Sequence, residues 1–207
     1  MSVLLAAVMA HQSAAFMTGT ASLAVSRRAN YFASAATRGT SADGPVAEKV
    51  LQNPKWPPTW PYSDLDFSRM DESDDAIFYS QPRLVYHIDD PAVSALTQYY
   101  AENFKNDEDV LDICSSWVSH YPKDWKGGNV VGLGMNEYEL KQNKQLSSYV
   151  VKDLNDEPVL PFDDGSFDKV TCVVSIDYLN KPLQVVREIG RVLRPGGKCI
   201  LSMSNRW

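Results

Sequence analysis

The sequence lacks several features that would assign it to a functional class at once. Its 207 residues include only three cysteines, and their spacing is not that of a metal site. It has no basic stripe, and its formal net charge of −6 is unlike that of a nucleic-acid-binding domain. We therefore expect no metal ion and no nucleic-acid partner, and we expect the cysteines to be small buried residues rather than disulfide partners.

Acidic residues are missing from the first 40 positions, which are rich in Ala, Ser and Thr and carry Arg27, Arg28 and Arg38. This composition is typical of organelle transit peptides. The apolar run Val3–Ala10 is too short to span a bilayer, which takes ~20 residues, although it could be the apolar part of a secretory signal. We expect residues 1–42 to be a targeting segment, cleaved or disordered, for a plastid or a mitochondrion. The alternative is a disordered tail without a targeting role.

Residues 43–90 have a different composition. Prolines alternate with aromatic residues from Pro54 to Tyr62, and proline fixes φ and removes a donor, so this part should be extended. We expect Trp56 and Trp60 to pack the segment onto its own domain, in preference to the alternative of a proline-binding partner. Arg83 and His87 are its most notable polar residues.

A helix should follow this segment, because Asp90 is a good N-cap and Pro91 suits the first helical position. Apolar residues then recur at helical spacing. They are Val93, Leu96, Tyr100 and Phe104.

From this helix onward, short apolar strands alternate with helical segments. A helix should start near Asn136, which opens a sequence resembling a capping box. Asn180 should cap another helix, and Arg194–Gly197 should end it. This alternation indicates an α/β fold with a parallel sheet and helices on both faces. The expected strands are residues 109–114, 129–133, 149–153, 167–175 and 198–203.

The segment Asp109–Trp117 is central to this arrangement. It reads as an apolar strand that passes into a loop of small residues. In an open parallel sheet, ligands most often bind beside such a loop, at the carboxyl ends of the strands. This loop is therefore the expected centre of the functional site.

Two strings carry a resemblance to a known family. They are Leu160-Pro-Phe-Asp-Asp-Gly-Ser-Phe-Asp168, before and within the fourth strand, and Arg194-Pro-Gly-Gly197, before the fifth. With this spacing, residues 109–205 resemble a class I S-adenosylmethionine-dependent methyltransferase of the type 11 group. Residues 79–100 and 114–120 resemble a little-characterised plant and algal subgroup of it.

The resemblance implies a Rossmann-like domain over residues 91–207, with strands in the order third, second, first, fourth, fifth. Family members continue into two further strands, which are absent from this sequence. We therefore expect an incomplete domain whose fifth strand is an exposed edge. The extended N-terminal segment or a partner chain could cover that edge, or the sequence could be an incomplete gene product.

The same resemblance implies S-adenosylmethionine as cofactor and a small molecule or a protein as methyl acceptor. The family places three glycines after the first strand, where this chain has Cys114, Ser116 and Val118. Valine at positive φ would be strained, so we expect either a different loop path or an altered pocket. The family's ribose-binding acid at the end of the second strand is replaced by Gly134, whereas the acid near the adenine is retained as Asp153.

The candidate cofactor residues lie at the ends of four strands. Asn136 is the nearest polar substitute for the missing acid, and Met135 could lie along the adenine. The full set is Asp112, Cys114, Ser115, Ser116, Gly134, Met135, Asn136, Asp153, Leu154 and Ser175.

No catalytic residue follows firmly from the sequence, because methyl transfer depends mainly on proximity and alignment. The candidate bases are Asp177 and Tyr178, which follow the fourth strand, and His87. The leading function is a methyltransferase of unknown acceptor. The alternative is a methyltransferase-like binding or assembly protein of an organelle that has lost turnover.

Overall fold

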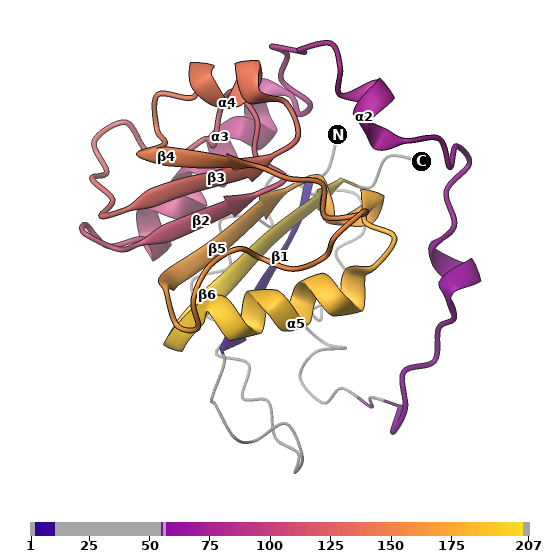
Figure 1. The fold of residues 1–207 in the computed structure, drawn as a ribbon. Helices are drawn as coiled ribbons and strands as arrows, with labels where there is room; N and C mark the ends of the chain where they lie inside the picture. The colour runs from indigo at the N-terminus through magenta and orange to yellow at the C-terminus, as the bar shows by residue number, and fades with distance from the viewer. Residues whose placement is uncertain (1–2, 11–54, 56, 205–207) are drawn as a thin grey trace, which may run out of the picture.

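The structure is a computed structural model that describes residues 3–10, 55 and 57–204. Its centre is a sheet of five parallel strands in the order β6-β5-β2-β3-β4. This arrangement is the order expected from the sequence (Figure 1). The strands are β2 (Val110–Ile113), β3 (Val130–Gly134), β4 (Ser148–Val151), β5 (Phe167–Val173) and β6 (Leu193–Ser204).

Helices cover both faces of this sheet. Successive strand residues point to opposite faces, so Leu111 of β2 packs beneath α5 (Pro182–Val192), with Ile189 in the same cluster. Its neighbour Val110 packs with Leu96 of α3 (Asp90–Asn103) on the other face. Figure 1 shows α5 in front of β5 and β6, with α3 behind the sheet. The remaining helical elements are short: η2 (Asp64–Phe67), α2 (Asp75–Phe78), α4 (Glu137–Gln142) and η3 (Ile176–Tyr178).

Two helix starts differ from the sequence expectation. The N-cap of α3 is Asp89, whose Oδ1 accepts the Ala92 amide at 3.1 Å, so Asp90 is the first helical residue. The start of α5 has no side-chain cap, and its N-cap is Lys181. The amide of Asn180 instead donates to Asn155, which ties it to the loop after β4. The sequence could not indicate this partner, because it lies 25 residues away.

The amino ends of the strands are held by ionic contacts. Arg194 donates to Asp109 before β2 and to Asp168 in β5, both at 2.7 Å. Arg191 of α5 donates to the carbonyl oxygens of Leu160 and Phe162, at 2.8 and 2.7 Å. The two strings that carry the family resemblance therefore meet here and fix the turn between β4 and β5.

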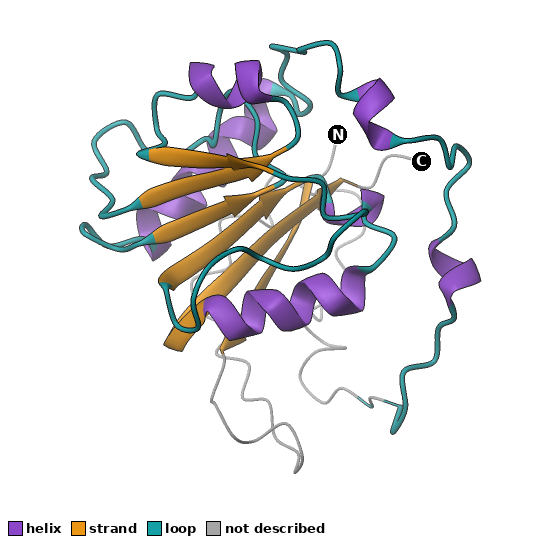
Figure 2. Ribbon diagram, in the orientation of Figure 1, coloured by secondary structure: helices purple, strands orange, loops and turns teal. Residues whose placement is uncertain are grey.

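The connection from β2 to β3 contains no helix in the structure, and Figure 2 shows it as a long loop. Its aromatic residues pack on α3 instead. Tyr121 and Trp125 surround Phe104 with ring centroids 5.4 and 5.2 Å away. The loop after β2 is therefore continuous with the core on the α3 face.

The N-terminal part of the chain gives two results. Val3–Ala10 forms β1, which pairs antiparallel with β6, so the edge expected to be exposed is covered by residues 3–10 rather than by the proline-rich segment.

Trp60 stacks on Phe67 of its own segment, because η2 turns the chain back, and it stays half exposed instead of packing on the sheet domain. Trp56 and residues 11–42 lie outside the described residues, so targeting by residues 1–42 stays a prediction.

The cysteines are free, and Cys172 and Cys199 are buried as expected. None of the helices in the described part of the chain is long and apolar enough to cross a membrane.

Candidate active site

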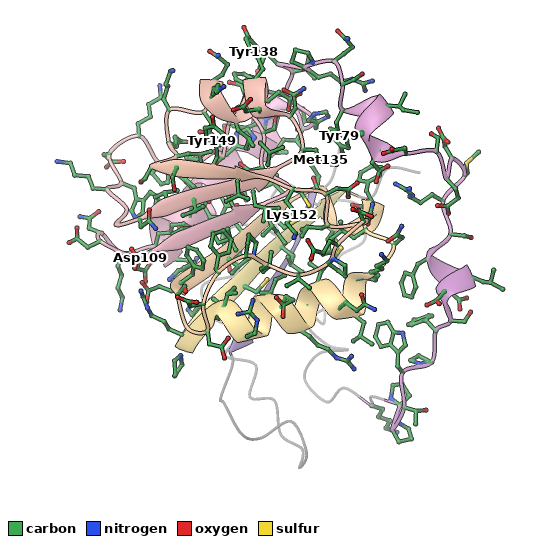
Figure 3. All side chains as sticks on the ribbon, viewed as in Figure 1. Tyr79, Asp109, Met135, Tyr138, Tyr149 and Lys152 are labelled. Carbon is green, nitrogen blue, oxygen red and sulfur yellow. The ribbon has the colours of Figure 1, made fainter. Side chains whose placement is uncertain are left out.

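The site lies where four parallel strands end at one edge of the sheet. Cys114 follows β2, Gly134 ends β3, Asp153 follows β4 and Ser175 follows β5. The topology therefore brings together the residues that the sequence placed in the site. Figure 3 shows Met135 and Lys152 at this edge and Asp109 at the opposite end.

The loop after β2 bends at Cys114, which has φ of 53°. A left-handed backbone is favourable for glycine and uncommon for other residues, so Cys114 adopts a conformation that suits the family's glycine. Val118 is not among the positive-φ residues of the described chain. The strain expected for a valine at positive φ is therefore absent at Val118. A β-branched residue with positive φ does occur at Val174, with φ of 43°, directly after β5.

Asp112 lies beneath this loop and organises it. Its carboxylate is buried and accepts the hydroxyls of Ser115 and Ser119 at 2.7 and 2.6 Å, and that of Thr171 at 2.8 Å. Burial raises the pKa of Asp112, while the three hydroxyl donors oppose the rise. These donors use three of the acceptor positions of the carboxylate, so Asp112 positions the loop from below.

Asn143 holds the same loop from the side. Its Nδ2 donates to Ser119 Oγ at 2.8 Å and to the Ser116 carbonyl oxygen at 3.1 Å. Side-chain hydrogen bonds therefore fix a path that the family shapes with glycines.

Gly134 is needed at the end of β3. A Cβ atom there would lie 2.1 Å from the Ser115 carbonyl oxygen, which is far inside contact distance. The loop after β2 therefore fills the space that an acidic side chain at this position would need. Ser115 is bound to β3 through its own amide, which donates to the Leu133 carbonyl at 2.8 Å.

Asn136 is committed to local structure. Its Oδ1 accepts the Glu139 amide at 3.0 Å, which caps α4 as the sequence predicted, and its Nδ2 donates to the Tyr79 carbonyl at 2.8 Å. Asn136 thus fixes the position of Tyr79 and is not a simple replacement for the missing acid.

The segment that includes Tyr79 crosses the carboxyl edge of the sheet. We call residues 75–88 the strap. It is fixed at separate points: Asp75 accepts from Asn155 at 2.8 Å, the Arg83 amide donates to Glu139 at 2.6 Å, and the Val85 carbonyl accepts the Trp117 indole at 3.1 Å. Figure 1 shows α2, the start of the strap, on the side to which the strand arrows point.

Trp117 is turned toward the strap, where its ring lies 4.9 Å from that of Tyr86. Figure 3 shows Tyr79 near this edge of the sheet, on the same side as Met135. Burial raises the pKa of Tyr79 to about 12, and the nearby groups Cys114, Asp75, Glu139 and Tyr178 add to the rise. Tyr79 is therefore a neutral hydroxyl near groups from α2, the loop after β2, α4 and η3.

Asp153 follows β4 and turns its own loop. Its Oδ1 accepts the Asn155 amide at 2.7 Å, and no described residue donates to its Oδ2. Leu154 is buried in the core, so only its backbone can face a ligand. Ser175 donates its hydroxyl to the Val173 carbonyl at 2.8 Å, which uses its hydrogen in the turn before η3.

The candidate bases are spread apart. Asp177 and Tyr178 are exposed on η3, beside the strap. His87 is exposed on the strap. His120, which packs against Tyr86, has a pKa lowered by burial.

The sequence reading missed Glu139. Its carboxylate is buried, and it accepts the Ser116 hydroxyl at 2.5 Å in addition to the Arg83 amide. Its position in the capping-box pattern was a signal for the helix start. The two partners could not be inferred, because they lie 23 and 56 residues away in the chain.

Comparison with known proteins shows which proteins this part of the chain is similar to. Residues 111–201 match the family model described as a methyltransferase domain. The chain is 34% identical over 103 residues to a ubiquinone biosynthesis O-methyltransferase of Pseudomonas aeruginosa, covering 47% of this chain and 44% of that protein. It is 33% identical over 94 residues to a demethylmenaquinone methyltransferase of Renibacterium salmoninarum, covering 45% and 40%.

Among solved structures, a putative methyltransferase of Bacillus halodurans is similar with 27% identity and a TM-score of 0.45, over 54% of this chain and 50% of that one. The chain spans less than half the length of the two relatives it matches by sequence. The five parallel strands have the order that the resemblance in sequence implied. Over residues 111–201 the chain is therefore similar to a methyltransferase domain.

Proposed function

We propose that this protein transfers a methyl group from S-adenosylmethionine to an acceptor bound at the carboxyl edge of the sheet. The observation that carries the proposal is the family match over residues 111–201, which spans the strands whose ends form this edge. The relatives are named for methyl transfer, and this supports turnover over the alternative of a binding protein without activity.

The residues at the edge fit the nucleoside part of the cofactor. Asp153 keeps Oδ2 without a donor among the described residues, so it can accept the adenine amino group. Met135 directly follows β3, whose last residue, Gly134, pairs with Val151 of β4. When bound, S-adenosylmethionine supplies an electrophilic methyl group on a sulfonium. The protein then has to align the acceptor with that methyl group and exclude water.

Two elements are suited to that alignment. The strap lies over the edge and is joined to the loops after β2 and β4. Asp177 and Tyr178 of η3 lie beside it, and either could take the proton of an acceptor hydroxyl as the methyl group is transferred. The Asn155 side chain links the two elements by donating to Asp75 and to the Tyr178 carbonyl.

We infer that the acceptor is a small molecule with an apolar ring. Phe78 and Tyr79 pair at 5.0 Å, and Phe78 and Tyr178 are each more than half exposed around the same edge. The names of the quinone-related relatives agree with such an acceptor.

Calorimetric titration of the full chain with S-adenosylmethionine and S-adenosylhomocysteine tests the proposal. We expect binding in the micromolar range, and we expect Asp153→Asn to weaken it about tenfold, as for loss of a charge-assisted hydrogen bond. Transfer of labelled methyl to a panel of phenols then tests the acceptor class. Absence of binding at millimolar concentration by the folded chain would contradict the proposal.

Targeting is a separate proposal. Residues 1–42 have the acid-poor, arginine-bearing composition of an organelle targeting segment. Fused to a fluorescent protein, they should direct it to a plastid or a mitochondrion, and diffuse cytoplasmic fluorescence would contradict this proposal.

A further inference from the structure

The buried carboxylate of Glu139 has an unusual position. In a capping box, a glutamate in the first helical turn reaches back to the amide of its own N-cap. Glu139 has that position in α4, but its two oxygens accept from the Ser116 hydroxyl and the Arg83 amide, at 2.5 and 2.6 Å. The side chain is thus directed to the loop after β2 and to the strap, where only 7% of Glu139 is exposed.

Both recorded partners of this carboxylate are neutral donors. A buried carboxylate is costly unless it is paired or well supplied with hydrogen bonds. Its two oxygens offer about four acceptor positions, so Ser116 and Arg83 leave room for about two more donors. Among the described residues, the Glu139 side chain is therefore a buried acceptor with unused accepting capacity.

The end of β3 cannot supply a carboxylate at this edge. A side chain at Gly134 would meet the Ser115 carbonyl oxygen at 2.1 Å, and that oxygen would also repel an anion. Nucleoside sites in doubly wound folds commonly use an acidic residue to accept the ribose hydroxyls. Glu139 lies five residues after Gly134 in the sequence. It accepts the hydroxyl of Ser116, which is next to Ser115, the residue whose carbonyl oxygen fills the space beside Gly134.

We propose that Glu139 accepts the two ribose hydroxyls of the nucleoside cofactor, and this assignment rests on the proposed function. A vicinal diol presents two O–H donors side by side, which match the two oxygens of one carboxylate. The Arg83 amide, bonded to the same group, would then make the strap part of the ribose site.

The test compares two ligands on the full chain: S-adenosylhomocysteine and its 2′,3′-dideoxy analogue. The wild-type chain should bind the ribose form about 10- to 100-fold more tightly, as expected for hydrogen bonds to a charged acceptor. In Glu139→Gln, affinity for the ribose form should fall by about the same factor. Affinity for the dideoxy form should change little, so the preference for ribose is lost.

A matched control is available on the same helix. Glu137 is exposed and pairs with Lys141 at 2.9 Å, so Glu137→Gln should leave the ribose preference intact. If Glu139→Gln does not fold, as judged by its thermal transition, Glu139→Asp retains the charge on a shorter side chain. This variant should show a reduced preference for ribose.

The outcomes are distinguishable. A purely structural role for Glu139 would weaken both ligands equally and keep the ribose preference, which overturns the assignment while the proposed function stands. Failure of the wild-type chain to bind either ligand would overturn the assignment and the proposed function together.

Discussion

The two ends of the sheet are held by different kinds of side-chain contact. At the amino end, long charged side chains join the strands, with Arg194 between Asp109 and Asp168. At the carboxyl end, the buried carboxylate of Asp112 accepts hydrogen bonds from the Ser115 and Ser119 hydroxyls of the loop after β2. The first arrangement lies near the surface and stabilises the fold. The second is buried and shapes a site, so we expect it to tolerate change much less.

The largest expected effect is that of Asp112→Asn. The amide replaces one accepting oxygen with a donor, which leaves at least one buried hydroxyl without its acceptor. Breaking a buried charged network in this way should lower the free energy of unfolding by about 2–4 kcal/mol. Urea denaturation measures it, with Asp153→Asn as a control that should change stability by less than about 1 kcal/mol. Equal losses for the two variants would contradict the role of Asp112 in holding the loop after β2.

Gly134→Ala should be next. The added methyl group would meet the backbone of Ser115, which cannot move without disturbing the loop, so we expect a loss of about 1–3 kcal/mol and weaker cofactor binding. The matched control is Gly132→Ala, whose closest neighbour is the flexible end of the Leu146 side chain, and its loss should be smaller. A well-tolerated Gly134→Ala would mean that the loop after β2 does not lie against β3.

Arg194→Met tests the opposite end. It keeps most of the aliphatic stem and removes both ion pairs. Because the Arg194 side chain is 39% exposed, solvent weakens these pairs and the loss should be about 1 kcal/mol. Cofactor affinity should stay within a factor of two on calorimetric titration, given the length of the strands between the two ends. A large loss of binding would show that the two ends are coupled.

Asp109→Asn should have the smallest effect, and one that depends on pH. The Asn129 amide and then Arg194 lower the pKa of Asp109 in the folded state. The unfolded chain therefore takes up this proton first as the pH falls. The resulting stabilisation is present above the ordinary aspartate pKa of about 3.9 and is lost below it.

We expect Asp109→Asn to cost about 0.5 kcal/mol at pH 7 and progressively less as the pH falls below about 3.9. The exposed Asp163 provides the control, since Asp163→Asn should have little effect at either pH. Denaturation curves at several pH values measure the difference. A cost that stays constant with pH would argue against the ionic origin of this contact.

Some features of the fold could be predicted from the sequence, and others could not. The helical stripe of α3 follows from periodicity, because it depends on near neighbours in the chain, whereas the strand order followed from the resemblance of two local strings to a known family. The predicted N-cap of α5, Asn180, was wrong, because the Asn180 amide donates to Asn155 in another loop.

Predictability is lower at the site. The sequence indicated that glycines were missing and that Asp153 was retained, and it placed the candidate residues at one edge. It could not indicate that Asp112 would bond three hydroxyls, or that Glu139 would leave its helix cap for Ser116 and Arg83. Those contacts join residues that only the folded sheet brings together.

The central claim is that the carboxyl edge, with its loop held by side chains instead of glycines, accepts a sulfonium nucleoside. The most direct measurement is a titration of the isotopically labelled chain with S-adenosylmethionine, followed by amide NMR signals. The account predicts saturable shifts at residues 114–119, Glu139 and Asp153, with no change at Arg194. Unchanged spectra at millimolar ligand, or shifts confined to the amino end of the sheet, would contradict it.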